Sequence, residues 1–131
     1  MDLLSKETIL GAQDKATRDV EVPEWGGIVR VRTMSATERD RWESDTYGTG
    51  KINSVNFRAR FVALCLIDEK GCRMFSDADI EKLGEKSAGA LQRVFNAAQE
   101  LNALSAKDIG DLEKNSEAGP SAGSSSSSPG V

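Results

Sequence analysis

The sequence has no histidine and only two cysteines, Cys65 and Cys72. Without histidine, a serine or cysteine nucleophile has no imidazole base to activate it. Two cysteines alone do not supply the four soft ligands of a structural zinc site. The acidic pair Asp77 and Asp79 is explained by the preference of carboxylates for the start of a helix. The composition therefore predicts a protein that is not an enzyme and that holds no metal and no cofactor.

Long apolar runs are missing as well. The longest, FVALCLI at residues 61–67, is far shorter than the roughly 18 residues that cross a bilayer. The start of the chain, MDLLSKETIL, carries an acid at Asp2 and no cleavable apolar stretch, unlike a signal peptide. We therefore expect a cytosolic protein that does not associate with membranes.

Basic residues are outnumbered, because 17 Lys and Arg stand against 21 Asp and Glu, for a net charge of -4. Sequence-independent binding to nucleic acid needs a basic surface that displaces counterions. Nucleic acid is therefore not an expected partner, and binding to another protein is the default role.

Two alternating segments indicate a β-hairpin. Valines recur at every second position in residues 17–22 and again in residues 28–34. The connecting PEWGG supplies Pro23, which ends a strand, and glycines, which accept positive φ. The pattern predicts two antiparallel strands joined by a loop longer than the tightest turns.

Helix-start signals recur along the chain. Ser35 with Glu38 forms one capping box, and Ser76 with Asp79 forms another. The expected helices cover residues 5–10, from 35 to a break at 47–50, from 53 or 54 to about 67, 76–84 and 88–104, with a last turn after Ser105. Residues 72–75 are expected to form a short edge strand, and Trp42 is expected to face the hairpin.

The first expected helix carries four apolar side chains, Leu3, Leu4, Ile9 and Leu10. We expect them to dock on the core. The alternative is that this end of the chain stays loose until a partner arrives.

Residues 115–131, NSEAGPSAGSSSSSPGV, have almost no apolar surface to bury, so we expect a disordered Gly/Ser/Pro-rich tail. The folded domain is expected to span residues 1–114. Its predicted fold class is α+β, with an N-terminal β-hairpin packed against a small bundle of α-helices and Cys65 as a small core residue.

Three segments resemble the tail assembly chaperones of long-tailed, siphovirus-type bacteriophages, which are encoded just before the tape measure protein. The segments are LSKETIL near the start, VEVPEWGGIVRVRTMSATERDRWE at 20–43, and LCLIDEKGCRMFSDADIEKLGEKSAGALQRVFNAAQELNALS at 64–105. The VPEWGG block, followed by an Arg-hydrophobic-Arg strand and a Ser-x-x-Glu helix start, is the distinctive part.

The resemblance implies a function. Members of this family bind the long helical tape measure protein, keep it soluble, and help to bring tail tube subunits to it. They leave before the virion is finished. The resemblance therefore implies a non-enzymatic chaperone in the host cytoplasm, absent from the mature virion, with the tape measure protein and the tail tube protein as partners.

The resemblance also suggests a second product, because many family members are made in two lengths by programmed ribosomal frameshifting. Lys114 and Asn115 can be encoded by a slippery run of adenines, at the expected end of the folded part. Our hypothesis is that a minority of ribosomes slip there and add a different C-terminal domain. A gene without a heptameric slippery site and an overlapping second frame would contradict it.

An unassembled tape measure protein exposes apolar helical stripes, which a groove or helix face can receive. The wide apolar arc of the helix at 53–67 is the first candidate surface, with Phe57 and Phe61 as anchors. The helix at 88–104 is the second. The alternative is that both helices only form the core. Self-association through the same faces is a further option.

Trp25 in the hairpin loop is the third candidate partner-binding residue. We expect its ring to fold over Val20 and Val31 as a lid and to donate its N–H to a loop carbonyl. The alternative is an exposed anchor for a partner.

Two other functions are compatible with these features. One is a small structural tail or neck subunit that is retained in the virion. The other is a host-directed regulatory adaptor encoded by a prophage, which would capture host proteins and no tail proteins.

Overall fold

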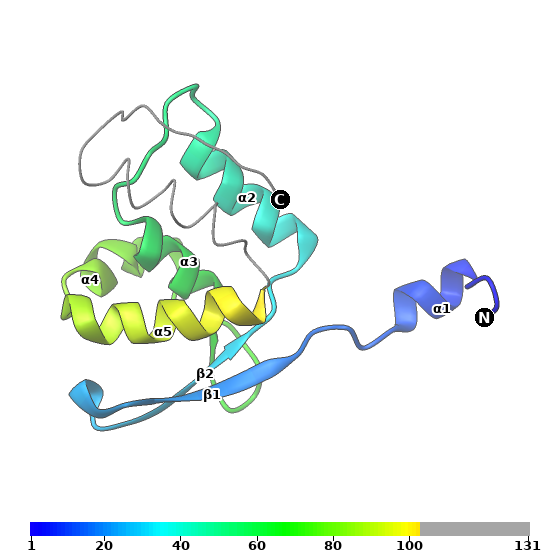
Figure 1. Cartoon of the computed structure of the whole chain (residues 1–131), viewed down its shortest axis with the longest axis horizontal. Coiled ribbons are helices and arrows are strands. Elements are labelled where there is room, and N and C mark those ends of the chain that lie inside the picture. The colour runs from blue at the N-terminus through cyan, green and yellow to red at the C-terminus, as the bar shows by residue number, and fades with distance from the viewer. Residues whose placement is uncertain (103–131) are drawn as a thin grey trace.

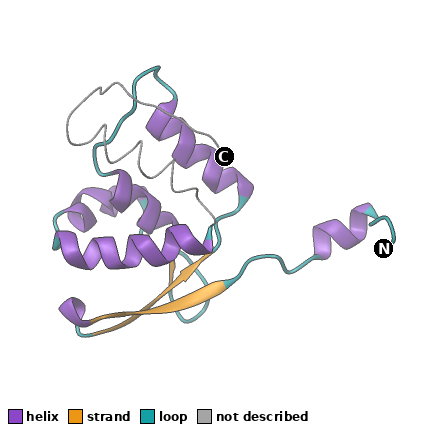
Figure 2. Ribbon diagram, viewed as in Figure 1, coloured by secondary structure: helices purple, strands orange, loops and turns teal. Residues whose placement is uncertain are grey.

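The computed structural model describes residues 1–102, and Figure 1 labels its main elements. In chain order they are α1 (Lys6–Gly11), β1 (Thr17–Val22), η1 (Pro23–Trp25), β2 (Gly27–Arg32), α2 (Ala36–Tyr47), α3 (Phe57–Cys65), β3 (Leu66–Ile67), η2 (Asp77–Asp79), α4 (Ile80–Gly84) and α5 (Ala88–Leu101). A small antiparallel sheet lies against the helices, and α5 runs along one of its faces (Figure 2). The predicted α+β fold class is confirmed.

The predicted hairpin is confirmed. β1 and β2 pair in antiparallel register from Thr17 opposite Arg32 to Val22 opposite Gly27. The loop contains a short 3-10 turn, followed by Gly26 at φ 77°, a left-handed conformation that glycine adopts without steric cost. β2 ends at Arg32, two residues earlier than predicted. Two residues further on, the backbone N–H of Met34 donates to the side-chain oxygen Oδ1 of Asn102 at 2.8 Å.

The predicted limits of the third helix are wrong at both ends. α3 begins only after Asn56, which has φ 54°, and it ends at Cys65. Leu66 and Ile67 form β3, which pairs antiparallel with β2. A short buried strand and a buried helix both read as continuous apolar runs, so periodicity alone does not separate them. The predicted edge segment is confirmed in part, because Arg73 forms a β-bridge with Ile67.

The first capping box is confirmed at the start of α2. The Ser35 hydroxyl accepts the backbone N–H of Glu38, and the Glu38 carboxylate accepts the backbone N–H of Ser35. The same carboxylate accepts two hydrogen bonds from Arg32, at 2.9 and 2.7 Å, which joins the end of β2 to α2. Burial raises the pKa of Glu38, but the hydrogen bonds from Arg32 and Ser35 outweigh it and hold this pKa below its ordinary value.

Trp42 does not face the hairpin as predicted. Its ring meets the Phe61 ring edge-on at a centroid distance of 5.1 Å, and its indole N–H donates to the carbonyl of Phe57 at 3.4 Å. The prediction is wrong because α3 is the element that packs against α2.

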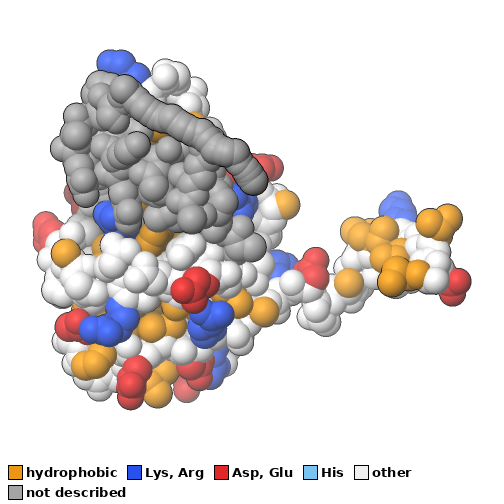
Figure 3. All heavy atoms as spheres, viewed as in Figure 1, with side chains coloured by type: hydrophobic (Ala, Val, Ile, Leu, Met, Phe, Trp, Pro, Cys, Tyr) orange, Lys and Arg blue, Asp and Glu red, His pale blue; other side chains and the backbone are white. Residues whose placement is uncertain are grey.

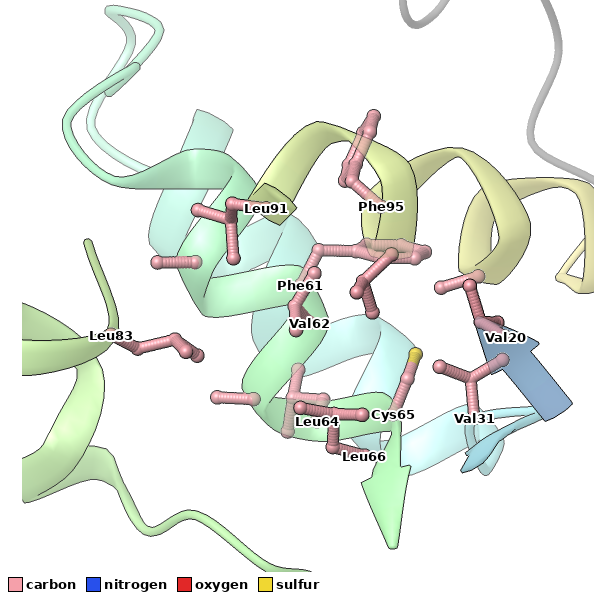
Figure 4. Close-up of a cluster of buried hydrophobic side chains, with 14 of the residues drawn as sticks. Val20, Val31, Phe61, Val62, Leu64, Cys65, Leu66, Leu83, Leu91 and Phe95 are labelled. Carbon is pink, nitrogen blue, oxygen red and sulfur yellow. The ribbon is translucent and has the colours of Figure 1, made fainter. Parts of the chain in front are cut away.

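The core lies between α3, α5 and the inner face of the sheet, as the close-up in Figure 4 shows. The sheet contributes alternating valines, and α3 contributes an almost unbroken buried stretch. The residues of this core with no more than 1% exposure include Val22, Val31, Phe61, Val62, Cys65, Leu66, Val94 and Phe95. Cys65 is confirmed as a core residue.

The predicted N-terminal helix is confirmed, but its docking on the core is wrong. Ser5 caps α1 by accepting the backbone N–H of Thr8. Figure 1 shows α1 well away from the remaining elements, beyond the end of the sheet. All residues of the N-terminal arm, which we define as residues 1–16, are exposed. The chain leaves β1 along the line of the strand, which carries α1 outward.

The second capping box is confirmed, since the Ser76 N–H donates to the Asp79 carboxylate at 2.9 Å. The helical segment that this capping box begins starts with the 3-10 turn η2. It continues as α4, which ends at Gly84 as predicted. α5 begins at Ala88, where the Ser87 hydroxyl caps it, and ends at Leu101.

Several predictions fall on residues outside those described. They are the end of the last helix at 104, the turn after Ser105, the domain boundary at 114 and the tail at 115–131. Within residues 1–102, no helix is long and apolar enough to cross a membrane.

Candidate partner-binding surfaces

Phe57 and Phe61, the predicted anchors, are only 2% and 0% exposed. Phe61 packs edge-on against Trp42 and against Phe95, with centroids 5.1 and 5.4 Å apart, and Phe57 packs edge-on against Phe95 at 6.0 Å. The wide apolar arc of α3 is thus used inside the molecule, where α2 and α5 cover it. The structure places both rings in the core, which is the alternative that the sequence left open. Their contact with a partner stays a prediction.

The second candidate surface, on the last helix, is used in the same way. Leu91, Val94, Phe95 and Ala98 of α5 are all buried. Its apolar stripe faces α3 and the sheet. The apolar stripe of α5 is therefore not exposed for contact with a partner in this structure.

Trp25 is half-buried at the hairpin tip and packs against the core. The core cluster that it packs against contains Val20 and Val31, and the ring also lines an open pocket. Its indole N–H donates no hydrogen bond to a residue within 1–102. The tip is tied to α5 by an ion pair in which Arg93 donates to Glu24 at 2.9 Å. The structure thus combines parts of the two expected roles, because one side of the ring rests on the core and another faces the pocket.

We call this opening the Trp25 pocket. It has a volume of about 340 Å³ and is lined by Trp25, Phe75, Leu83, Lys82 and Lys86. An internal cavity of about 150 Å³ is enough to bind benzene, so the pocket has room for apolar side chains of a partner. Its floor is aromatic and aliphatic, while two exposed lysines form its rim. The sequence indicated Trp25 but not Phe75 or Leu83, which only the fold brings beside it.

The N-terminal arm is a second uncovered apolar surface. Leu3, Leu4, Ile9 and Leu10 are 100%, 67%, 57% and 75% exposed. The space-filling view of Figure 3 shows hydrophobic atoms gathered on the projecting arm, away from the main body. Four large apolar side chains on so short a segment are typical of an interaction surface.

The third apolar surface is a groove of about 300 Å³ on the outer face of the sheet, opposite to α5. Ile67 forms its floor at 5% exposure, and Ile28 and Met74 stand beside it at 66% and 47%. We call it the sheet groove; its lining residues are Asp19, Ile28, Val29, Arg30, Ile67, Asp68, Glu69 and Met74. The sequence did not predict β3, which completes the groove by pairing with β2.

The described residues show little that suits reactive chemistry. Burial raises the pKa of the Cys65 thiol to about 12, which keeps it protonated and weakly nucleophilic at neutral pH. Within residues 1–102, no group of three or more Cys, Asp or Glu side chains is placed to hold a metal ion. The geometry supports binding through apolar surfaces.

Comparison with known proteins agrees with this description. A family model described as phage tail assembly chaperone matches residues 6–115. The solved structure of the bacteriophage HK97 tail assembly chaperone is similar, with a TM-score of 0.56 and 20% identity over 76% of this chain and 94% of that chain. At this level of identity the likeness concerns the fold. No match was found among curated proteins.

Proposed function

The chain belongs to the phage tail assembly chaperone family, and we propose that it binds the tape measure protein, keeps it soluble and helps to bring tail tube subunits to it. In this proposal it acts by binding alone, without catalysing a reaction. It works in the host cytoplasm and leaves before the virion is complete.

One observation carries the choice of binding site: the ring of Trp25 is only half-buried and lines an apolar pocket together with Phe75 and Leu83. A tape measure helix presents apolar side chains at i, i+3, i+4 and i+7, and a pocket on a chaperone can receive one or two of them. Trp25 is suited to anchor them, because a large rigid ring offers much contact area at little cost in conformational entropy. Lys82 and Lys86 favour a client stripe that is flanked by acids.

The test is co-expression of the full chain with the large protein encoded immediately downstream. We expect the soluble fraction of that protein to rise with the wild-type chain and to fall again with Trp25→Ala. The melting temperature of Trp25→Ala is measured in parallel. Because one side of the Trp25 ring rests on the core, some loss of stability is expected, and client capture is counted per folded molecule. An anchor loses capture by that measure, whereas a lid loses stability alone.

Val55→Ala is the matched control, because Val55 is 70% exposed and does not line the Trp25 pocket. It should solubilise the client as well as the wild type does. If the downstream protein is equally insoluble with and without the wild-type chain, the chaperone function is wrong. If Val55→Ala and Trp25→Ala behave alike, the Trp25 pocket is not the client site.

The alternative function, a structural tail or neck subunit, predicts a different fate for the protein. Mass spectrometry of purified virions distinguishes the two, because a chaperone is absent and a subunit is present in fixed copy number. We also propose that frameshifting near Lys114 yields a longer form. The nucleotide sequence of the gene and the mass of the products from a single transcript test this.

A further inference from the structure

The rim of the Trp25 pocket carries positive charge without a partner among the described residues. Lys82 and Lys86 are exposed there, and neither forms an ion pair with another residue of 1–102. Their sequence neighbours Glu81 and Glu85 do not line the pocket. An occupant of this pocket should therefore combine apolar side chains with carboxylates.

The chain contains a segment of that composition after the described residues. Residues 108–113, which we call the DIGDLE segment, have three acids, two large aliphatic side chains and no base. They follow Asn102 closely and precede the Gly/Ser/Pro-rich stretch. The DIGDLE segment thus resembles the client that the pocket favours, an apolar surface flanked by acids.

The order of these residues also suits one face of a helix. On the helical turn that the sequence predicts after Ser105, Ile109 and Leu112 are neighbours, because they are three residues apart. At 3.6 residues per turn, Asp108 and Glu113 flank this apolar pair at about 70° on either side. The bordering bases, Lys107 and Lys114, fall on the opposite face of the same turn. The face that would enter the pocket is therefore apolar with acidic edges.

The DIGDLE segment is long enough to return to the pocket. α5 ends where Asn102 accepts the backbone N–H of Met34, and Lys86 of the pocket lies just before the opposite end of α5. The 14 residues of α5 span about 21 Å. With residues 103–107 extended and one helical turn after them, Leu112 reaches about 26 Å from Asn102. A helix that simply continued α5 would carry Leu112 away from the pocket.

The sheet groove is a poorer match for the DIGDLE segment. Its lining contains Asp19, Asp68 and Glu69 and a single base, Arg30. Arg30 already donates two hydrogen bonds to Asp19. An acidic segment would therefore meet like charge in the sheet groove. Charge complementarity assigns it to the Trp25 pocket.

We propose that the DIGDLE segment folds back into the Trp25 pocket of its own chain and competes there with the client. Ile109 and Leu112 cover the apolar floor, and Asp108 and Glu113 face the two lysines of the rim. A tether this short gives an effective concentration of about 1 mM, so a contact with a dissociation constant of about 0.1–1 mM is formed in roughly half to nine-tenths of the molecules. The competition rests on the proposed function, whereas the docking does not.

The experiment is acrylamide quenching of tryptophan fluorescence in the full chain. The chain has two tryptophans, and Trp42 is only 2% exposed, so quenching reports mainly on Trp25. We expect Ile109→Ser/Leu112→Ser to raise the quenching constant about twofold or more, because the ring of Trp25 loses its cover. The matched control is Leu3→Ser/Leu4→Ser, which changes two exposed leucines of the N-terminal arm and should leave quenching unchanged.

A charge exchange tests the pairing across the rim. Glu113→Lys and Lys86→Glu should each weaken the docking about twofold to fivefold, as expected for an exposed ion pair. The chain that carries both substitutions should regain protection of Trp25. Glu117→Lys is the control, because it makes the same charge reversal outside the DIGDLE segment.

A synthetic peptide of residues 105–114 supplies the segment as a separate molecule. At about 1 mM it should restore protection of Trp25 in the Ile109→Ser/Leu112→Ser variant. A peptide of the same composition in scrambled order should not. Far-ultraviolet circular dichroism should show the same folded domain in every variant.

Equal quenching of the wild type and Ile109→Ser/Leu112→Ser overturns the proposal, as does a peptide without effect. Protection that grows with protein concentration over roughly 1–100 µM means that copies exchange their segments, and docking within one chain is then wrong.

Co-expression with the downstream protein tests the competition. Ile109→Ser/Leu112→Ser should raise the soluble fraction of that protein above the wild-type value. If quenching responds but this fraction does not, the competition is wrong while the docking stands. If the downstream protein is insoluble even with the wild-type chain, the proposed function fails, and the quenching result is unaffected because it needs no client.

Discussion

The substitution Phe61→Ala separates a core residue from a partner anchor. Phe61 is 0% exposed and packs edge-on against Trp42 and Phe95. Truncation of a buried phenylalanine to alanine costs about 3–5 kcal/mol, and each edge-to-face aromatic pair contributes about 0.5–1.5 kcal/mol beyond the buried area. With two such pairs lost, we expect a loss in the free energy of unfolding of about 4 kcal/mol.

The assay is urea unfolding followed by far-ultraviolet circular dichroism. With a denaturant slope of about 1–3 kcal/mol per molar urea for a small domain, the midpoint should fall by roughly 2 M. Because small domains have only about 5–15 kcal/mol of stability, the variant can unfold outright. Phe61→Leu, with an expected loss of about 1–2 kcal/mol, provides a second measurement on a folded protein.

The control is Leu4→Ala on the N-terminal arm, where an exposed side chain should change stability by less than about 0.5 kcal/mol. Client capture is measured per folded molecule, so that unfolding is not mistaken for lost binding. A loss of less than about 1 kcal/mol for Phe61→Ala, together with lost capture, would refute the assignment of Phe61 to the core. It would point to a second conformation in which α3 is uncovered.

Three further predictions follow from local geometry. The pKa of Glu38 is lower in the folded chain than the ordinary glutamate value of about 4.5. Its stabilising effect is therefore complete above about pH 4.5 and is lost as the pH falls through the folded pKa, and Glu38→Gln should flatten this acid dependence in urea titrations. A thiol reagent at neutral pH should modify exposed Cys72 but not Cys65, whose pKa is raised to about 12, so one of the two cysteines reacts in the native chain and both react in denaturant. A Cβ at Gly84 would lie 2.5 Å from the side-chain oxygen of Asn56, which can rotate aside, so Gly84→Ala should change the free energy of unfolding by less than about 1 kcal/mol in urea titrations, much as Gly27→Ala should, where a Cβ meets nothing within 4 Å.

The features predicted well from the sequence are those that depend on neighbouring residues. The Ser35 capping box, the β1 strand and the end of α4 at Gly84 are each encoded within a few positions, by a side chain that caps, alternates or permits a turn. Local chemistry of this kind does not require knowledge of the tertiary fold. The family resemblance rested on the same local blocks.

The errors arose where distant elements decide the outcome. Leu66 and Ile67 form a strand because they lie beside the edge of β2 that β1 leaves unpaired. Trp42 packs against Phe61 because the tertiary fold places α3, and not the hairpin, beside α2. The wide apolar arc of α3 suggested a surface for a partner, yet it is covered by two other helices. An apolar pattern shows which residues avoid water, but not whether the same chain or another chain covers them.

The charges around the exposed apolar surfaces help to divide them between partners. The Trp25 pocket carries lysines on its rim and the sheet groove carries acids, so a ligand suited to one is repelled by the other. A client whose apolar stripe is flanked by acids would therefore enter the Trp25 pocket and avoid the sheet groove. The two surfaces lie apart, because the Trp25 pocket is at the hairpin tip beside α4 and the sheet groove lies on the outer face of the sheet. Reversal of Lys82 should therefore lower the soluble fraction of the co-expressed client, whereas reversal of Glu69 should leave it unchanged.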